Sequence, residues 1–291
     1  MNERHAEQII LDNLIFPEGL RWHDGHLWFC DVETHEVITA DGDGVVQDRK
    51  AFPGEHPIGL AWTPNGELIV GGRFERLLTY RDGKSELLQD LRADGTDSWS
   101  NDTVIDAAGR TYLASFGKAY DLEDHPSNER RLKGAGRILL RGTDGIVREV
   151  AKGLSMPNTM QITADENTLI CSDSMAHRIV SYDIHQDGTL GPEMVYAEFE
   201  CYPDGSTLDV EGGLWVALPS VQQARRLVNG EVTDVVHFDG EVFDVALGGP
   251  NRTSLYAAVS NLQATTPPTD GQERSRPGRI YRIEVDVPAA R

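Results

Sequence analysis

Short runs of four to six apolar residues alternate with turn residues along the whole chain. Pairs such as Asp24-Gly25 and Asn65-Gly66 separate neighbouring runs, and such pairs are typical of tight β-hairpins. Gly, Asn and Asp interrupt every apolar run before helical spacing can extend over a helix of usual length. The pattern therefore predicts an all-β chain of many short strands.

One local pattern recurs six times. In each copy a short segment of two to four residues leads into a strand-like run, which is followed by a tight turn and a second strand-like run. At one register the six copies carry Glu18, Ile58, Asn101, Asn158, Asp204 and Val242. The separations between these positions are 40, 43, 57, 46 and 38 residues. A period of about 40 to 50 residues with four strands per unit is typical of a β-propeller. We therefore predict a six-bladed β-propeller.

The two ends of the chain bear on how the repeat closes. The sixth copy ends after residues 278–285 and is one strand short, while residues 8–11 read as a strand that precedes the first copy. We expect this N-terminal strand to close the last blade and so to remove its open edge. Because the repeat runs through nearly all of the chain, we predict one domain over residues 1–291.

Two insertions interrupt the repeat. Residues 117–131 account for the long step between the third and fourth copies, and residues 262–277 are rich in Thr, Pro, Gly and charge. A loop like the first is either a lid over a site or a tolerated surface excursion, and both interpretations stay open. We expect the second to be a mobile surface loop of the last blade.

Four of the six register positions carry side-chain oxygens, and these are Glu18, Asn101, Asn158 and Asp204. Each could by itself be an ordinary turn residue. The apolar copies show that the turn does not require a polar residue, and a propeller brings equivalent positions to one axis. We therefore predict a metal or polyol site. Oxygen ligands favour Ca²⁺, with Mg²⁺ or Mn²⁺ next and Zn²⁺ possible through the carboxylates.

Two residues beside Asn101 are further candidates. Asp102 could ligate a metal, pair with a cation or orient a neighbour, and we include it among the substrate-binding residues. Trp99 precedes Asn101 by two residues and is expected to stack on a substrate. For the other tryptophans we expect packing inside the blades. They are Trp22, Trp28, Trp62 and Trp215.

The charge of the chain limits its partners. Lys and Arg number 27 against 47 Asp and Glu, which gives 27 − 47 = −20. Nucleic acid and anionic membrane surfaces are therefore poor partners, and a small-molecule substrate is expected. The polar start resembles no signal peptide, and no run approaches the about 18 apolar residues of a membrane span. We expect a cytoplasmic monomer or homodimer.

Three cysteines, an odd number, lie far apart in the sequence. Cys30 and Cys171 fall inside strand-like runs, so buried free thiols are expected. Cys201 lies close to the proposed site, but no histidine stands at a fixed spacing to activate it as a nucleophile.

Several motifs, taken in order, resemble one family. They are Pro17-Glu18-Gly19, Ser100-Asn101-Asp102, Pro157-Asn158 and Pro203-Asp204-Gly205-Ser206. As a set these motifs are similar to the SMP-30/gluconolactonase/regucalcin (LRE-like) family. The resemblance implies a six-bladed propeller with one divalent cation, Ca²⁺ or Zn²⁺, held by Glu18, Asn158 and Asp204. It also implies that Asn101 contacts the substrate or completes the site, and that the substrate is a sugar lactone or related cyclic ester.

The chain departs from that family at three positions. Trp99 stands where sugar-lactonase members often carry Arg, and Thr103 and Thr159 stand where Gly is common. Without that Arg to grip sugar hydroxyls, a more apolar or aromatic ring substrate is expected.

The resulting hypothesis is a lactonase. A cation acts as Lewis acid on the lactone carbonyl, and Asp204 is the general base for the attacking water. Two alternatives use the same fold. One is a phosphotriesterase-type propeller that hydrolyses organophosphates, and the other is a metal-binding propeller without catalysis.

Overall fold

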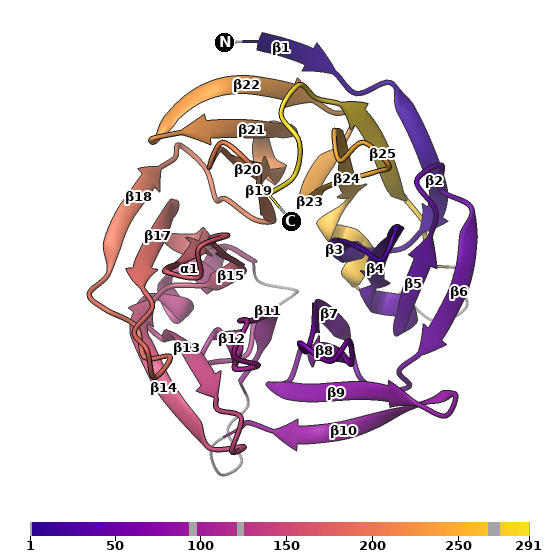
Figure 1. Ribbon diagram of the computed structural model, residues 1–291. Helices are drawn as coiled ribbons and strands as arrows, with labels where there is room; N and C mark the ends of the chain where they lie inside the picture. The colour runs from indigo at the N-terminus through magenta and orange to yellow at the C-terminus, as the bar shows by residue number, and fades with distance from the viewer. Residues whose placement is uncertain (1, 93–97, 121–124, 267–273, 291) are drawn as a thin grey trace. The chain divides into compact units, whose positions relative to one another are not determined.

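The computed structural model describes residues 2–92, 98–120, 125–266 and 274–290. These residues form six sheets, five of four strands and one of five. The predicted fold class, an all-β six-bladed β-propeller, is confirmed. The chain divides into two compact units, Met1–Ala51 with Asp204–Arg291 and Phe52–Pro203, with three blades in each (Figure 1). The single domain over residues 1–291 stays a prediction.

The first unit contains blades 1, 5 and 6, numbered in chain order. Blade 1 comprises β3 (Pro17–His23), β4 (His26–Asp31), β5 (Glu36–Ala40) and β6 (Val46–Ala51). Blade 5 comprises β19 (Ser206–Leu208), β20 (Leu214–Leu218), β21 (Gln223–Val228), β22 (Glu231–His237) and β1 (Asn2–His5). Blade 6 comprises β23 (Glu241–Gly248), β24 (Ser254–Ser260), β25 (Gly278–Glu284) and β2 (Gln8–Leu14).

The second unit contains blades 2, 3 and 4. Blade 2 comprises β7 (Pro57–Trp62), β8 (Leu68–Gly72), β9 (Arg76–Arg81) and β10 (Lys84–Asp90). Blade 3 comprises β11 (Ser100–Ile105), β12 (Thr111–Ser115), β13 (Gly136–Arg141) and β14 (Val147–Leu154). Blade 4 comprises β15 (Pro157–Ile162), β16 (Thr168–Asp173), β17 (Arg178–Asp183) and β18 (Met194–Glu198).

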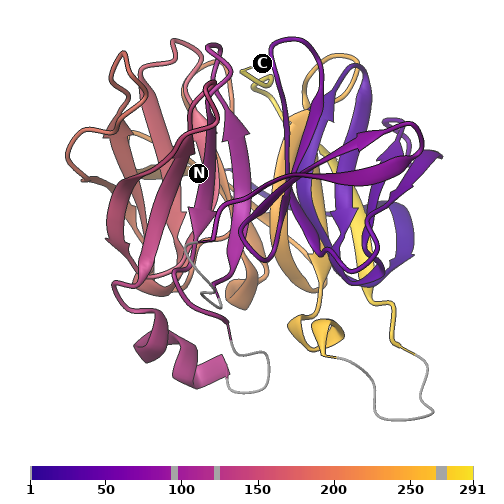
Figure 2. The same ribbon diagram turned by 90° about the horizontal axis from the view of Figure 1, so that it is seen from below.

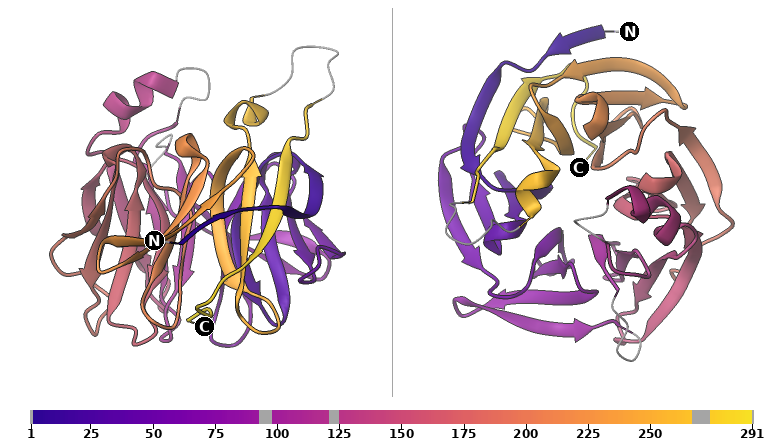
Figure 3. Two further views of the ribbon diagram at one scale, coloured as in Figure 1. Left: turned by 90° about the horizontal axis from the view of Figure 1, so that it is seen from above. Right: turned by 180° about the vertical axis from the view of Figure 1, so that it is seen from behind.

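The N-terminal strands complete two sheets of the first unit. β2 pairs with β25 in antiparallel fashion, so the predicted closing strand of the last blade is confirmed. β1 lies along β22 at the N-terminal end of the chain (Figure 3) and pairs with it in parallel. In this pairing Asn2 is opposite Asp234. This fifth strand was not predicted, because residues 2–5 are polar and show no alternation that would indicate a strand.

The first insertion contains a short helix, α1 (His125–Leu132), which lies at one end of the blades of its unit (Figure 2). The sequence pattern did not predict it, since Leu132 is its one clearly apolar residue. Leu132 is fully buried and packs with Phe116 and Tyr120. Residues 121–124 and 267–273 lie outside the described residues, so the lid and the mobile-loop interpretations stay predictions.

Two buried aspartates join neighbouring blades. Asp102 accepts the N–H groups of Thr103, at 2.8 Å, and Met160, at 3.0 Å, and so links blade 3 to blade 4. Asp244 accepts the N–H groups of Val245, at 2.8 Å, and Leu20, at 2.6 Å, and links blade 6 to blade 1. Each carboxylate therefore satisfies two buried backbone donors, one in its own blade and one in the next.

The Asp244→Ala variant is expected to lose about 2–4 kcal/mol of unfolding free energy, because the N–H groups of Val245 and Leu20 lose a charged acceptor. Denaturant titration measures the change. Asp187→Ala, in an exposed turn, is the control and should change the free energy by no more than about 0.5 kcal/mol. Equal midpoints for the two variants would show that the Asp244 carboxylate does not stabilise the fold.

Candidate functional site

The predicted oxygen-bearing positions lie at β-bulges where the first strand of each blade begins. The strand pairing shifts between Glu18 and Arg21, and equivalent shifts occur in four other blades. In blade 5, Asp204 and Gly205 both bond to Ala217, at 2.9 and 2.8 Å, which is the same two-against-one arrangement. A bulge directs an extra side chain out of the regular alternation, so all these blades present one residue in an equivalent way.

The sixth register position is Phe243, and the predicted Val242 is wrong by one residue. Asp102 and Asp244 make the same pair of hydrogen bonds, so they are equivalent, and Phe243 corresponds to Asn101. The strand pairing agrees, since Val242 is paired with Val259 in front of the bulge. The Phe243 ring lies 4.8 Å from that of Phe16, so the position remains apolar.

The four oxygen-bearing register residues are buried, with exposed fractions between 2% and 8%. In the second unit, Asn101 and Asn158 stand on β11 and β15, which pack against each other. In the first unit, Glu18 lies on β3 and Asp204 stands two residues before β19, and both strands pack against β23. Each unit therefore carries two of the four predicted residues near the starts of strands. In the second unit these strands contact each other, and in the first unit both contact β23.

The predicted metal ligands form a donor set of two carboxylates and one carboxamide. This set suits a hard cation, because every ligand atom is an oxygen and the set contains neither a His nitrogen nor a Cys sulfur. Within the described ranges, no group of three or more His, Cys, Asp and Glu side chains is placed to hold a metal ion. The predicted set has only two such residues, Glu18 and Asp204, with Asn158 as the third ligand.

The segment that carries Trp99 is anchored by a buried glutamate that the sequence did not indicate. Glu75 is fully buried, accepts a hydrogen bond from Ser98 Oγ at 2.7 Å and pairs with Arg137 at 3.1 Å. Its own N–H donates to Ser100 Oγ at 2.9 Å. The residues on both sides of Trp99 are therefore fixed to the turn of blade 2. No pattern in the sequence distinguishes Glu75 from an exposed turn residue.

Trp99 lies in a group of aromatic and cationic side chains. Its ring is stacked on Tyr120 at 6.2 Å and meets Phe74 edge to face at 6.1 Å. The Arg73 guanidinium lies 4.9 Å from the Trp99 ring centre, and Arg73 is only 7% exposed. Blade 2 thus supplies an arginine beside the position where the sequence of blade 3 has Trp99.

All three cysteines are buried and free, which confirms the prediction for Cys30 and Cys171. Burial, followed by the nearby Asp173 carboxylate, raises the pKa of the Cys171 thiol well above its usual value. Cys171 is therefore protonated at neutral pH, which makes it a poor nucleophile.

No helix in the described part of the chain combines the length and apolarity needed to span a membrane.

Comparison with known families matches residues 16–261 to the SMP-30/Gluconolactonase/LRE-like region. Among curated proteins, the chain is 25% identical over 286 residues to pentonolactonase XacC of Haloferax volcanii, covering 92% of this chain and 90% of that protein.

Two further matches extend the comparison. The chain is 30% identical over 225 residues to strictosidine synthase-like 7 of Arabidopsis thaliana, covering 74% of this chain and 59% of that protein. Among solved structures, a calcium-binding regucalcin from Agrobacterium tumefaciens superimposes with a TM-score of 0.79 at 17% identity, over 99% of this chain and 97% of that one. At this identity the structural match bears on the fold alone.

Proposed function

The chain belongs to the SMP-30/gluconolactonase/LRE-like family, and on that basis we propose that it is a hydrolase that opens lactones with a bound divalent cation. The observation that carries the proposal is the placing of Glu18, Asn158 and Asp204 at equivalent, buried bulge positions of three blades. The match to a pentonolactonase over nearly its full length supports the reaction type.

Glu18, Asn158 and Asp204 are the proposed ligands of the cation. Ca²⁺ fits this all-oxygen set best, ahead of Mg²⁺ or Mn²⁺, and Zn²⁺ lacks its usual nitrogen and sulfur ligands here. When bound, a divalent cation polarises the lactone carbonyl and stabilises negative charge on its oxygen.

Asp204 is the proposed general base. Its carboxylate takes a proton from water as the water oxygen bonds to the lactone carbonyl carbon, and the proton then passes to the ring oxygen as its bond to that carbon breaks. The product is the open hydroxy acid. The Asn101 amide orients the substrate, and Asp102 contributes to substrate binding by fixing the backbone next to Asn101.

The aromatic group around Trp99 sets the proposed substrate preference. Trp99 is only partly buried, and its ring forms an apolar surface together with Tyr120 and Phe74, with the Arg73 guanidinium 4.9 Å from the ring centre. A lactone with an apolar or aromatic substituent would gain contact area there, whereas a ring covered only with hydroxyls would lose hydrogen bonds to water.

A lactone panel followed by proton release tests the proposed function. The panel consists of pentonolactone, gluconolactone, a phenyl-substituted lactone and a fluorophosphate, and each is assayed with and without a chelator. The metal content of the purified protein is determined separately. We expect lactone opening that the chelator abolishes and Ca²⁺ restores. Fluorophosphate hydrolysis alone would indicate the phosphotriesterase alternative, and cation binding without any turnover would indicate a non-catalytic propeller.

The Trp99→Arg variant should change substrate preference rather than destroy activity. We expect the ratio of kcat/KM for the phenyl-substituted lactone to that for pentonolactone to fall about tenfold, because the apolar surface is lost. Trp99→Phe retains an aromatic ring and should keep the wild-type ratio. An unchanged ratio in Trp99→Arg would remove Trp99 from the substrate site.

A further inference from the structure

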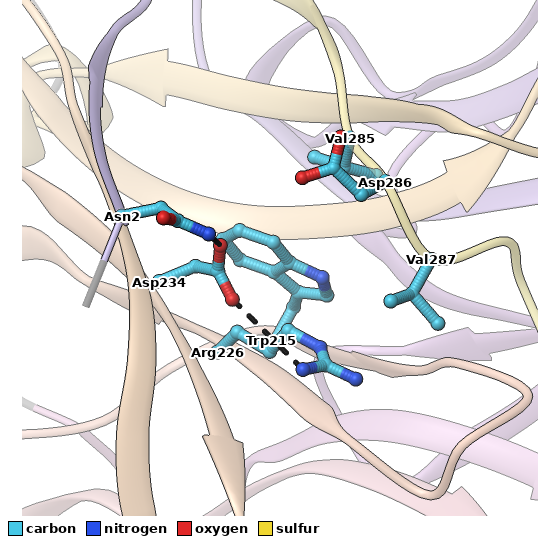
Figure 4. A pocket seen from close by; sticks show the side chains of 7 residues that line it. All are labelled: Asn2, Trp215, Arg226, Asp234, Val285, Asp286 and Val287. Carbon is cyan, nitrogen blue, oxygen red and sulfur yellow. Dashed lines mark hydrogen bonds and ion pairs between the residues drawn. The ribbon is translucent and has the colours of Figure 1, made fainter.

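A cavity of about 170 Å³ opens in the first unit, between the sheet of blade 5 and the segment that follows β25. It is lined by Trp215, Arg226 and Asp234 from blade 5, by Asn2 from β1, and by residues 285–287 (Figure 4). None of the residues proposed for lactone hydrolysis lines it. The function of this cavity is therefore a separate question from the proposed reaction.

Trp215 gives the cavity an unsatisfied donor. Its side chain is only 2% exposed, and its indole N–H has no hydrogen-bond partner among the described residues. In Figure 4 the indole nitrogen lies on the edge of the ring that faces Val287 across the cavity. A buried N–H without an acceptor is costly, so a bound molecule with an acceptor atom at this edge would be stabilised.

The opposite side of the cavity carries acceptors. Arg226 is held by Asp209 at 2.7 Å and by Glu211 at 3.0 Å, and it lies 3.9 Å from Asp234. The Asp234 carboxylate accepts the Asn2 amide at 3.0 Å on one oxygen and the Thr233 hydroxyl at 2.9 Å on the other, and each oxygen can accept a further donor.

The charges around the cavity select against an anion. Arg226 and Arg4 give +2, while four carboxylates give −4, so the sum is 2 − 4 = −2. The carboxylates belong to Asp209, Glu211, Asp234 and Asp286. A cation offers no lone pair, so it would leave the buried Trp215 indole N–H without an acceptor. A neutral molecule that both donates and accepts hydrogen bonds meets neither difficulty.

We propose that this cavity binds a small neutral polyol. One hydroxyl oxygen accepts from the Trp215 indole N–H, and another hydroxyl donates to the Asp234 carboxylate, while Val287 covers the carbon chain. The volume is below that of pockets for drug-sized ligands, so a chain of about three to five carbons fits. The proposal does not depend on the reaction proposed above.

The indole N–H resonances of ¹⁵N-labelled protein test this proposal. The Trp215→Phe variant assigns the Trp215 signal, and the Trp28→Phe variant assigns the Trp28 signal, which serves as the control. Titration with erythritol should shift the Trp215 signal saturably and leave the Trp28 signal in place. Erythronate, which has the same carbon chain with a carboxylate, should bind at least about tenfold more weakly.

A second variant tests the location even if Trp215→Phe folds poorly. Val287→Phe fills the cavity from the partly exposed segment after β25, so it should weaken erythritol binding at least about tenfold while lactone hydrolysis stays at the wild-type level. The proposal is overturned if erythritol produces no saturable shift, as for a cavity that holds only water. Equal binding of erythronate, or unchanged erythritol binding by Val287→Phe, would overturn it as well.

Discussion

Replacing Asp204 with asparagine is expected to lower kcat/KM for lactone hydrolysis by about 1,000-fold at neutral pH. Asparagine keeps the shape of the side chain and one oxygen that can bind a cation, but it cannot take the proton from water. The side chain is buried at its bulge, and because Asn has nearly the same size as Asp, the substitution is not expected to change the packing around it. The loss is measured by following proton release at a cation concentration that saturates both proteins.

Two comparisons make this result interpretable. Asp187→Asn removes the same charge from an exposed turn and should retain wild-type activity. Recovery of Asp204→Asn activity by excess cation would mean that Asp204 acts only as a ligand. Turnover within tenfold of wild type at every cation concentration would exclude Asp204 as the general base.

The second large effect is on cation binding. Glu18→Gln should weaken cation binding at least about 100-fold, because it removes one of two ligand charges. At a cation concentration 100 times its Kd, the wild type gains about 2.7 kcal/mol of unfolding free energy. The variant would gain only about 0.4 kcal/mol at the same concentration. Denaturant titration with and without Ca²⁺ measures both values.

An exposed glutamate provides the matched control for this comparison. Glu149→Gln lies on the outer strand of blade 3 and should keep the full gain in unfolding free energy from Ca²⁺. Equal stabilisation of Glu18→Gln and the wild type would show that the cation binds elsewhere on this acidic chain.

The sequence predicted the fold class well because each blade repeats its own turn chemistry. Five of the six register residues were also identified correctly, since Pro or the pair Asn101-Asp102 marks the step before the strand. The sixth copy has Phe243 and Val242 side by side with no such marker. Both residues are apolar, so the sequence does not show which of them lies at the bulge. The hydrogen bonds of Asp244 and the pairing of Val242 with Val259 establish it in the structure.

Features that depend on contacts between distant residues were not predictable. β1 is a strand only because the edge of β22 accepts it, since its own four residues are polar. Arg73 and Glu75 sit in a turn of blade 2 whose composition resembles other turns. Their burial against the segment around Trp99 follows from the packing of two neighbouring blades, which no local pattern encodes.

A crystal structure grown with Ca²⁺, or with Mn²⁺ for its anomalous signal, tests the central claim most directly. The account predicts a single ion per chain within about 2.3–2.6 Å of side-chain oxygens of Glu18, Asn158 and Asp204 for Ca²⁺. An ion bound elsewhere, or these three side chains too far apart to share one, would contradict it.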